Sequence, residues 1–438
     1  MAFQELKVSP DGHRLINQDG TVFFYLADTA WRLPRALNRE ETLLYMDKRQ
    51  AQGFNVLQVV ALDECDGLRR PNRYGRRPFV EVAPDQFDPT RPDLEGDDNY
   101  WAHMDFIIDQ AAARGMYIAL LPSWGDKVHR MAGYGPEIFN IDNAFTYGQW
   151  LGERYRGRPN MIWVMGGDRP MGRMRHFEVA RAMALGIKAS GDNHLMTFHP
   201  CGAESSADSV GEENWLDFNM TQSGHSRRRY NYEMITKGYS ITPAKPILDG
   251  EPGYEHHPDD FNPANGYLDE VDCRQEFFWS VLSGACGHTY GSHSVWGFWT
   301  PPVTGLVYFD RPGHFCMDWR QALDGKGANA MHIARDIVLS RDFLHAVPAP
   351  DLVKDQLPGT NHVPVLRSDS HIMLYIAQGI PATLDSARMP FESFAITWVN
   401  PRTGEHMAAG TGDIHSPLTF CPPTGGRGQD WVLVLDRA

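Results

Sequence analysis

The sequence lacks the patterns that mark several classes of protein. Its six cysteines are scattered, with no Cys-x-x-Cys pair and no compact Cys/His cluster, which disfavours a disulfide scaffold and a zinc site. No apolar run approaches the roughly 20 residues of a membrane helix. The first residues lack a charged start followed by an apolar run, so we expect no membrane association and a cytoplasmic protein, or a periplasmic or secreted one if a leader has been removed.

Clustered positive charge and nucleotide-binding motifs are also missing. The formal net charge of -14 argues against a nucleic-acid partner, because binding to phosphates depends on gathered Lys and Arg. There is no Gly-x-Ser-x-Gly elbow, phosphate-cradling loop or dinucleotide fingerprint. Serine-hydrolase and nucleotide chemistries are therefore excluded, and no cofactor is expected. The high count of 12 Trp residues weakly favours a carbohydrate ligand, since sugar rings commonly stack on exposed Trp faces.

From about residue 20 to residue 340, short β-rich runs alternate with amphipathic segments, which predicts parallel βα units. Eight such runs favour a closed (β/α)8 TIM barrel over an open sheet. The predicted strands are residues 23–27, 55–61, 117–121, 161–165, 195–199, 216–221, 246–249 and 288–291. The predicted helices after the first four strands are 40–52, 100–114, 145–155 and 175–190.

After Arg341 the pattern changes to short β runs at 372–377, 394–399 and 431–435, separated by Pro, Gly and Asn. This pattern predicts a small antiparallel β-sandwich. The Val-Pro-Ala-Pro segment at 347–350 has the composition of a tight connector between domains. We therefore expect a catalytic barrel over residues 1–345 and a sandwich domain over residues 346–438.

Two acidic residues directly follow predicted barrel strands. Asp168 comes after Gly166 and Gly167 at the end of strand four, and Glu251 ends the Asp-Gly-Glu stretch after strand seven. Each has a simpler interpretation, because Gly-Gly-Asp and Gly-Glu-Pro are also ordinary turns. Together they are more informative, since strands four and seven face each other across the barrel mouth. A pair of carboxyl groups flanking one bond is what glycoside hydrolysis requires.

Other strand ends add polar and aromatic side chains at the same face of the predicted barrel. We expect these residues to ring one substrate pocket: Asp28, Trp31, Trp124, His199, Gln222, His225, Tyr254, His293 and Trp296. A metal site is an alternative, because several histidines lie near the ends of predicted strands. No His-x-His or His-Glu-x-x-His motif supports it, so no metal is expected.

Five segments of the sequence resemble glycoside hydrolase family 140, the apiosidase-like hydrolases. These segments are Ala-Asp-Thr-Ala-Trp at 27–31, Trp-Val-Met-Gly-Gly-Asp at 163–168, Thr-Gln-Ser-Gly-His at 221–225, Asp-Gly-Glu-Pro at 249–252 and Tyr-Gly-Ser-His-Ser-Val-Trp at 290–296. The resemblance implies a (β/α)8 barrel followed by a β-sandwich described as a collagen-binding domain. It also implies that Asp168 is the acid/base and Glu251 the nucleophile.

The resemblance further implies release of a terminal apiose, a branched pentose, from plant pectic glycans by a retaining double displacement. In a retaining enzyme the two carboxyl groups lie about 5–5.5 Å apart. The alternatives are a glycosidase with a different sugar specificity and a non-catalytic carbohydrate-binding protein on a barrel scaffold. The partner in each case is an oligosaccharide or glycoside. The oligomeric state is not fixed by the sequence.

Overall fold

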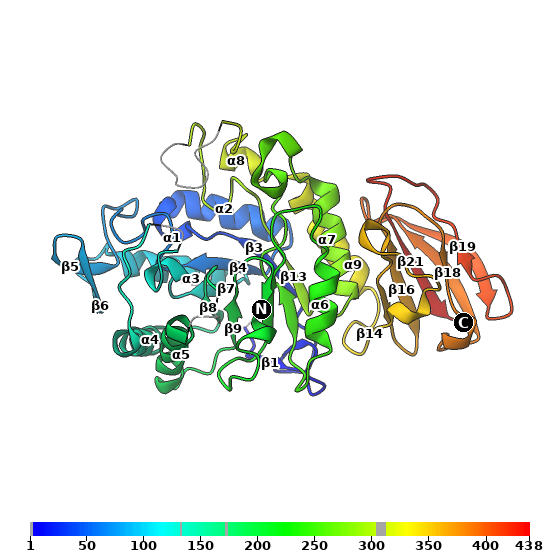
Figure 1. The fold of residues 1–438 in the computed structure, drawn as a ribbon, viewed down its shortest axis with the longest axis horizontal. Helices are drawn as coiled ribbons and strands as arrows, with labels where there is room; N and C mark the ends of the chain where they lie inside the picture. The colour runs from blue at the N-terminus through cyan, green and yellow to red at the C-terminus, as the bar shows by residue number, and fades with distance from the viewer. Residues whose placement is uncertain (1–2, 132–133, 171–173, 304–311) are drawn as a thin grey trace.

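The computed structural model describes residues 3–131, 134–170, 174–303 and 312–438. Eight parallel strands form the centre of the larger domain (Figure 1). They are β3 (Tyr25–Thr29), β4 (Val56–Val60), β7 (Tyr117–Leu121), β8 (Met161–Gly166), β9 (Met196–His199), β11 (Asn219–Gln222), β12 (Ile247–Asp249) and β13 (Gly287–Tyr290). Each lies on one of the eight predicted strands.

Hydrogen bonds close these strands into a barrel. Six strands pair in the order β13-β3-β4-β7-β8-β9, and β11 pairs with β12. The two groups are joined where the Asp217 amide donates to the Met196 carbonyl oxygen over 2.8 Å, and where the Cys286 amide donates to the Ile247 carbonyl oxygen over 2.9 Å. The predicted (β/α)8 barrel is therefore confirmed.

Every residue of the central strands except Gly166 is buried, because one strand face packs inside the barrel and the other packs on the helices. In β7, Ala119 and Leu121 belong to the cluster inside the barrel, whereas Ile118 and Leu120 belong to the cluster beneath the helices. Successive side chains of a strand point to opposite faces. Strands buried on both faces are continuously apolar, which is why these runs are visible in the sequence.

The helices surround the barrel, and four of them match the predictions closely. The helix that differs most is α4, which begins four residues before the predicted start because Asn140 caps it through the Asn143 amide. The helices are α1 (Leu33–Ala36), α2 (Arg39–Ala51), α3 (Tyr100–Ala113), α4 (Ile141–Tyr155), α5 (Met174–Ala189), α6 (Asn231–Tyr239), α7 (Glu270–Leu282), α8 (Trp319–Ala322) and α9 (Lys326–Leu339).

Three further pairings involve strands that lie outside the closed barrel. The hairpins are β1 (Leu6–Val8) with β2 (Leu15–Asn17), and β5 (Phe79–Ala83) with β6 (Gln86–Pro92), the second inside the long loop after β4. The short strand β10 (Glu204–Ser205) runs antiparallel to β11.

The C-terminal part is an antiparallel β domain, as predicted. Its six-stranded sheet has the order β14-β15-β16-β21-β18-β19, and a two-stranded sheet, β17 with β20, packs on it. The strands are β14 (Val347–Pro348), β15 (Val365–Arg367), β16 (His371–Ile376), β17 (Ala382–Thr383), β18 (Ser393–Val399), β19 (His406–Asp413), β20 (Thr419–Phe420) and β21 (Trp431–Arg437).

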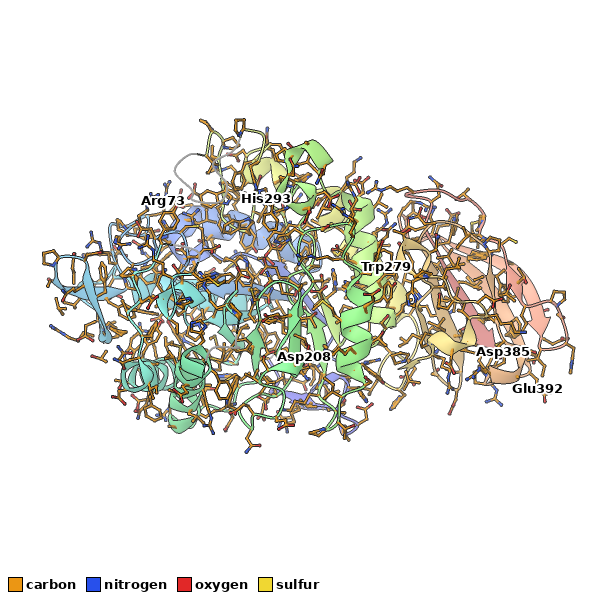
Figure 2. The ribbon with its side chains drawn as sticks, viewed as in Figure 1. Arg73, Asp208, Trp279, His293, Asp385 and Glu392 are labelled. Atoms are coloured by element: carbon orange, nitrogen blue, oxygen red, sulfur yellow. The ribbon has the colours of Figure 1, made fainter. Side chains whose placement is uncertain are left out.

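Helices α7 and α9 lie between the barrel and this sheet (Figure 1). Met373 and Tyr375 of β16 pack on the helices, whereas Ile372 and Leu374 face the small sheet on the other side. Trp279 of α7 lies on the side of the barrel that faces the C-terminal domain (Figure 2), in a crevice that Gln378 also lines. The sheet is thus apolar on both faces, and the two domains share one core.

A buried ion pair joins the two domains. Arg274 of α7 donates to both carboxylate oxygens of Asp430 over 3.1 and 3.0 Å, and the Tyr375 hydroxyl donates to the same carboxylate over 3.0 Å. We expect Asp430→Ala to destabilise the full chain by about 3–5 kcal/mol, because Arg274 is left as an unpaired buried charge. The measurement is the midpoint of thermal and urea unfolding.

The matched control for this prediction is Asp436→Ala. Asp436 also joins the two domains, through Arg341, but both side chains are about 30% exposed. A solvated pair of this kind contributes at most about 1 kcal/mol. Equal destabilisation by the two variants would contradict the assignment of a special role to the buried pair.

Candidate active site

A cavity of about 420 Å³ opens at the carboxyl ends of the barrel strands. This volume lies within the roughly 300–1,000 Å³ of small-molecule sites. Most of the predicted site residues line it, namely Trp31, Trp124, Asp168, Gln222, His225, Glu251, Tyr254, His293 and Trp296. The remaining lining residues are Glu64, Cys201, Gly202, Gly224, Arg229, His257 and Phe261.

Asp168 reaches the cavity through a backbone turn that depends on the preceding glycines. Gly166 and Gly167 have φ values of 92° and 111°, and Asp168 itself has a φ of 54°. A Cβ atom on Gly166 would collide with the carbonyl oxygen of His199. Glycine adopts positive φ without strain, and Asp is among the residues that tolerate the left-handed region. The turn leaves the Asp168 side chain 35% exposed.

The surroundings of Asp168 favour its protonated form. Burial, followed by the negative charge of Glu251, raises the pKa of Asp168 to about 6. Positive charge at His199 and Arg169 offsets part of this increase. A carboxyl group with such a pKa holds a proton in weakly acidic solution and can deliver it.

Glu251 follows β12 and has the opposite electrostatic environment. Its Oε2 lies 2.9 Å from His199 Nε2, and its Oε1 lies 3.3 Å from His225 Nε2. Burial alone would raise the pKa of Glu251, but the hydrogen bonds and positive charge of the two histidines outweigh it and lower the pKa to about 2. Glu251 is therefore ionised across the whole range in which Asp168 titrates.

The Nδ1 atom of each histidine, on the ring side away from Glu251, contacts a backbone carbonyl oxygen. His199 Nδ1 lies 3.0 Å from the Pro200 carbonyl oxygen, and His225 Nδ1 lies 3.1 Å from the Pro252 carbonyl oxygen. A carbonyl oxygen only accepts, so Nδ1 carries the hydrogen in both rings. The Nε2 atoms of both rings face Glu251, and their proximity is what keeps the pKa of this carboxyl low.

Two predicted site residues lie outside the cavity. Asp28 is fully buried on the outer side of β3, where its carboxylate accepts hydrogen bonds from the Tyr45 hydroxyl over 2.6 Å and from Arg49 Nε over 2.8 Å. The alternation of side chains along β3 directs Ala27 into the barrel and Asp28 out of it. Asp28 is therefore a structural residue, and the prediction that it lines the substrate pocket is wrong.

His199, the other predicted residue that does not line the cavity, lies directly beneath it. Its ring packs 5.4 Å from the rings of both Trp31 and Trp124, measured between centroids, and its Nε2 contacts Glu251. His199 therefore orients the carboxylate and does not itself face a ligand.

The sequence interpretation missed several residues that line the cavity, notably Glu64, Arg229, His257 and Phe261. Glu64 follows the predicted second strand as closely as other selected residues follow theirs, so its position was a usable signal. The other three lie inside long loops, where no periodic pattern marks them.

Trp124 and Gln222, which line the cavity, each carry a buried polar atom that has no hydrogen-bond partner among the described residues. These atoms are Nε1 of Trp124, a donor, and Oε1 of Gln222, an acceptor. Trp31 differs, since its Nε1 donates to the Tyr254 hydroxyl over 3.0 Å. A buried polar atom without a partner destabilises the fold unless a ligand or a water molecule forms a hydrogen bond with it. A donor and an acceptor in one cavity suit a ligand rich in hydroxyl groups.

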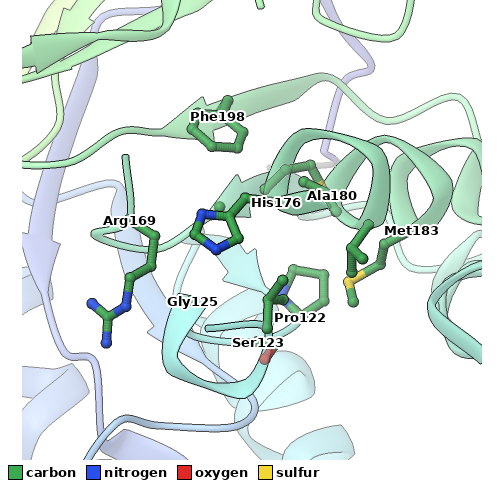
Figure 3. Close-up of a pocket in the computed structure, with 12 residues that line it drawn as sticks. Pro122, Ser123, Gly125, Arg169, His176, Ala180, Met183 and Phe198 are labelled. Atoms are coloured by element: carbon green, nitrogen blue, oxygen red, sulfur yellow. The ribbon is translucent and has the colours of Figure 1, made fainter. Parts of the chain in front are cut away.

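A second, mainly apolar cavity lies between α5 and the ends of β7, β8 and β9 (Figure 3). Pro122, His176, Met183 and Phe198 are among its lining residues. Neither Asp168 nor Glu251 lines it, and we assign it no chemistry.

Within residues 3–131, 134–170, 174–303 and 312–438, no group of three or more His, Cys, Asp or Glu residues is arranged to hold a metal ion. Over the same ranges, no helix has the length and apolar character needed to span a bilayer.

Comparison with known proteins places this arrangement in a family. A family model described as "Apiosidase-like, catalytic domain" matches residues 9–345, and one described as "Putative collagen-binding domain of a collagenase" matches residues 347–436. Among curated proteins there is no significant match.

Solved structures agree with the family models. A protein described as a glycoside hydrolase is 31% identical with a TM-score of 0.88, covering 99% of this chain and 97% of that chain. A glycoside hydrolase family 5 protein from Bacteroides vulgatus is 30% identical with a TM-score of 0.89, covering 99% and 94%. A family 5 mannosidase from Rhizomucor miehei shares the fold at 14% identity and a TM-score of 0.51, covering 77% and 100%.

The catalytic model covers most of the chain, and the first two structures cover nearly all of it at 30–31% identity. The chain therefore belongs to the apiosidase-like family of glycoside hydrolases.

Proposed function

We propose that this glycoside hydrolase is a retaining, exo-acting enzyme that releases a terminal pentose such as apiose from plant pectic glycans, as in glycoside hydrolase family 140. The observation that carries the proposal is the pair of carboxyl groups in one cavity with opposite protonation preferences. The pKa of Asp168 is raised to about 6 and the pKa of Glu251 is lowered to about 2. Such a separation supports Asp168 as the acid and Glu251 as the nucleophile.

In the first step Asp168 gives its proton to the glycosidic oxygen as the bond between this oxygen and the anomeric carbon breaks. The Glu251 carboxylate forms a bond to the same carbon, and the aglycone leaves as an alcohol. In the second step Asp168 takes a proton from water, whose oxygen displaces Glu251 from the sugar. Two displacements at one carbon restore the original configuration, and both side chains return to their starting states.

The pair of histidines supports this division of roles. His199 and His225 hold Glu251 by both oxygen atoms, so the nucleophile is charged and oriented before the substrate binds. Preorganised charge in a site that excludes water is a large contribution to catalysis. Trp124 Nε1 and Gln222 Oε1 are placed to bind hydroxyl groups of the sugar.

The choice of apiose is supported by the family model, which is described as apiosidase-like. The test is hydrolysis of apiose-containing pectic oligosaccharides and of aryl pentosides and hexosides, followed by proton NMR. We expect one terminal pentose to be released, initially in the anomeric configuration of the substrate. Initial release of the opposite anomer would refute the retaining mechanism, release of a different sugar would refute the specificity, and a protein that only binds glycans would release nothing.

A further inference from the structure

Glu64 is a third carboxyl group in the active-site cavity, and the double displacement described above does not use it. It lies in the turn after β4, is partly exposed, and lines the cavity together with Asp168 and Glu251. Among the residues that the structure describes, its carboxyl has no hydrogen-bond or ion-pair partner. Its position in the cavity is therefore not explained by a contact within the protein.

The two neighbours of Glu64 in the chain hold it in place. Arg35 donates to both carboxylate oxygens of Asp63 and, over 2.9 Å, to the carbonyl oxygen of Cys65. The Cys65 amide donates to Asp63 over 2.9 Å. Asp63 and Arg35 are both buried, so the backbone on either side of Glu64 is fixed. A side chain attached to such a rigid backbone loses little conformational entropy when a ligand binds.

The chemistry of this position suits hydroxyl groups. Burial, followed by the negative charges of Asp168 and Asp126, raises the pKa of Glu64 to about 8. The protonated carboxyl can donate one hydrogen bond and accept others. With the carboxylate of Glu251 in the same cavity, an anionic ligand group is disfavoured, whereas neutral hydroxyl groups can both donate and accept.

We propose that Glu64 binds two neighbouring hydroxyl groups of the terminal sugar and makes the cavity selective for sugars that carry both. The inference rests on the proposed glycosidase function. Trp124 and Gln222, which line the same cavity, would complete the contacts with the sugar. Glu64 is thus a residue that determines specificity and takes no part in bond breaking.

The test is Glu64→Ala, measured with 4-nitrophenyl apiofuranoside and with its 2-deoxy analogue, which lacks one of the neighbouring hydroxyl groups. We expect kcat/KM to fall on the order of 10²-fold with the complete sugar, because hydrogen bonds to a polar group in the site are lost. With the 2-deoxy analogue the loss should be much smaller. Glu64→Gln, which keeps one donor and one acceptor, should recover a large part of the activity.

The matched control is Asp66→Asn, which removes a carboxylate from the same turn. Asp66 pairs with Arg69 and Arg70 and does not line the cavity, so kcat/KM should change less than twofold. An unchanged kcat/KM in Glu64→Ala, or an equal loss with both glycosides, would overturn the proposal.

Failure of the proposed function would be recognised separately, because the wild-type protein would then release no sugar from the apioside. In that case calorimetric binding of the same two glycosides to the wild type and to Glu64→Ala still tests Glu64. Selective weakening with the complete sugar supports the proposal, and equal affinities of the two proteins refute it.

Discussion

Replacement of Glu251 by Gln is expected to lower kcat on the order of 10⁴-fold, the scale of loss when a central group of a covalent mechanism is disabled. An amide cannot form the glycosyl ester. The Gln side chain has nearly the same shape, so His199 and His225 keep a neighbour, and the fold should be retained. The measurement is steady-state hydrolysis of an aryl pentoside, with circular dichroism and the melting temperature as checks of folding.

The nucleophile can be tested further by chemical rescue. In Glu251→Ala, added azide can occupy the space of the carboxylate and attack the anomeric carbon in its place, giving a glycosyl azide of inverted configuration. The control is Glu204→Gln on β10, a partly buried glutamate that does not line the cavity, and its kcat should be unchanged. Substantial activity in Glu251→Gln without azide would disprove the assignment.

Replacement of Asp168 by Asn is expected to lower kcat/KM by about 10²- to 10⁴-fold for substrates with poor leaving groups, the usual contribution of general acid catalysis. The loss should be much smaller for a dinitrophenyl glycoside, because its leaving group departs without a proton. A series of aryl glycosides of increasing phenol pKa measures this dependence directly.

The same residue sets the pH dependence. The raised pKa of Asp168 means that it is protonated below about pH 6 and loses its proton as the pH rises through that value. Wild-type kcat/KM should therefore fall about tenfold per pH unit above pH 6, whereas the low pKa of Glu251 places the acidic limb near pH 2. Asp168→Asn should abolish this fall near pH 6, leaving only the weaker effect of Glu64 near pH 8. Persistence of the fall near pH 6 would show that another group is the acid.

Much of the barrel could be predicted because local patterns report it. A strand buried on both faces must be apolar throughout, as β7 is, and a helix end needs capping, as Asn140 provides for α4. The alternation of these elements implies parallel strands. Asp168 and Glu251 were selected for the same reason, since both lie at the ends of such strands.

The prediction for Asp28 was wrong because proximity to a strand end is not sufficient. A side chain on a barrel strand faces either the inside or the surrounding helices, according to its parity along the strand. Asp28 lies one position after Ala27, which faces inside, and so reaches Arg49 on α2. The partner Arg49 was equally visible in the sequence, but nothing local joined the two.

The sequence by itself determined the class of fold, the antiparallel C-terminal domain and the two carboxyl groups after strands β8 and β12. Only the tertiary structure decided that His199 and His225 contact Glu251, that Glu64 faces the same cavity, and that Arg274 meets Asp430 across the domains. The physical reason is the range of each interaction. Strands, helices and turns follow from neighbouring residues, whereas protonation and binding depend on atoms that only the closed barrel brings within a few ångströms.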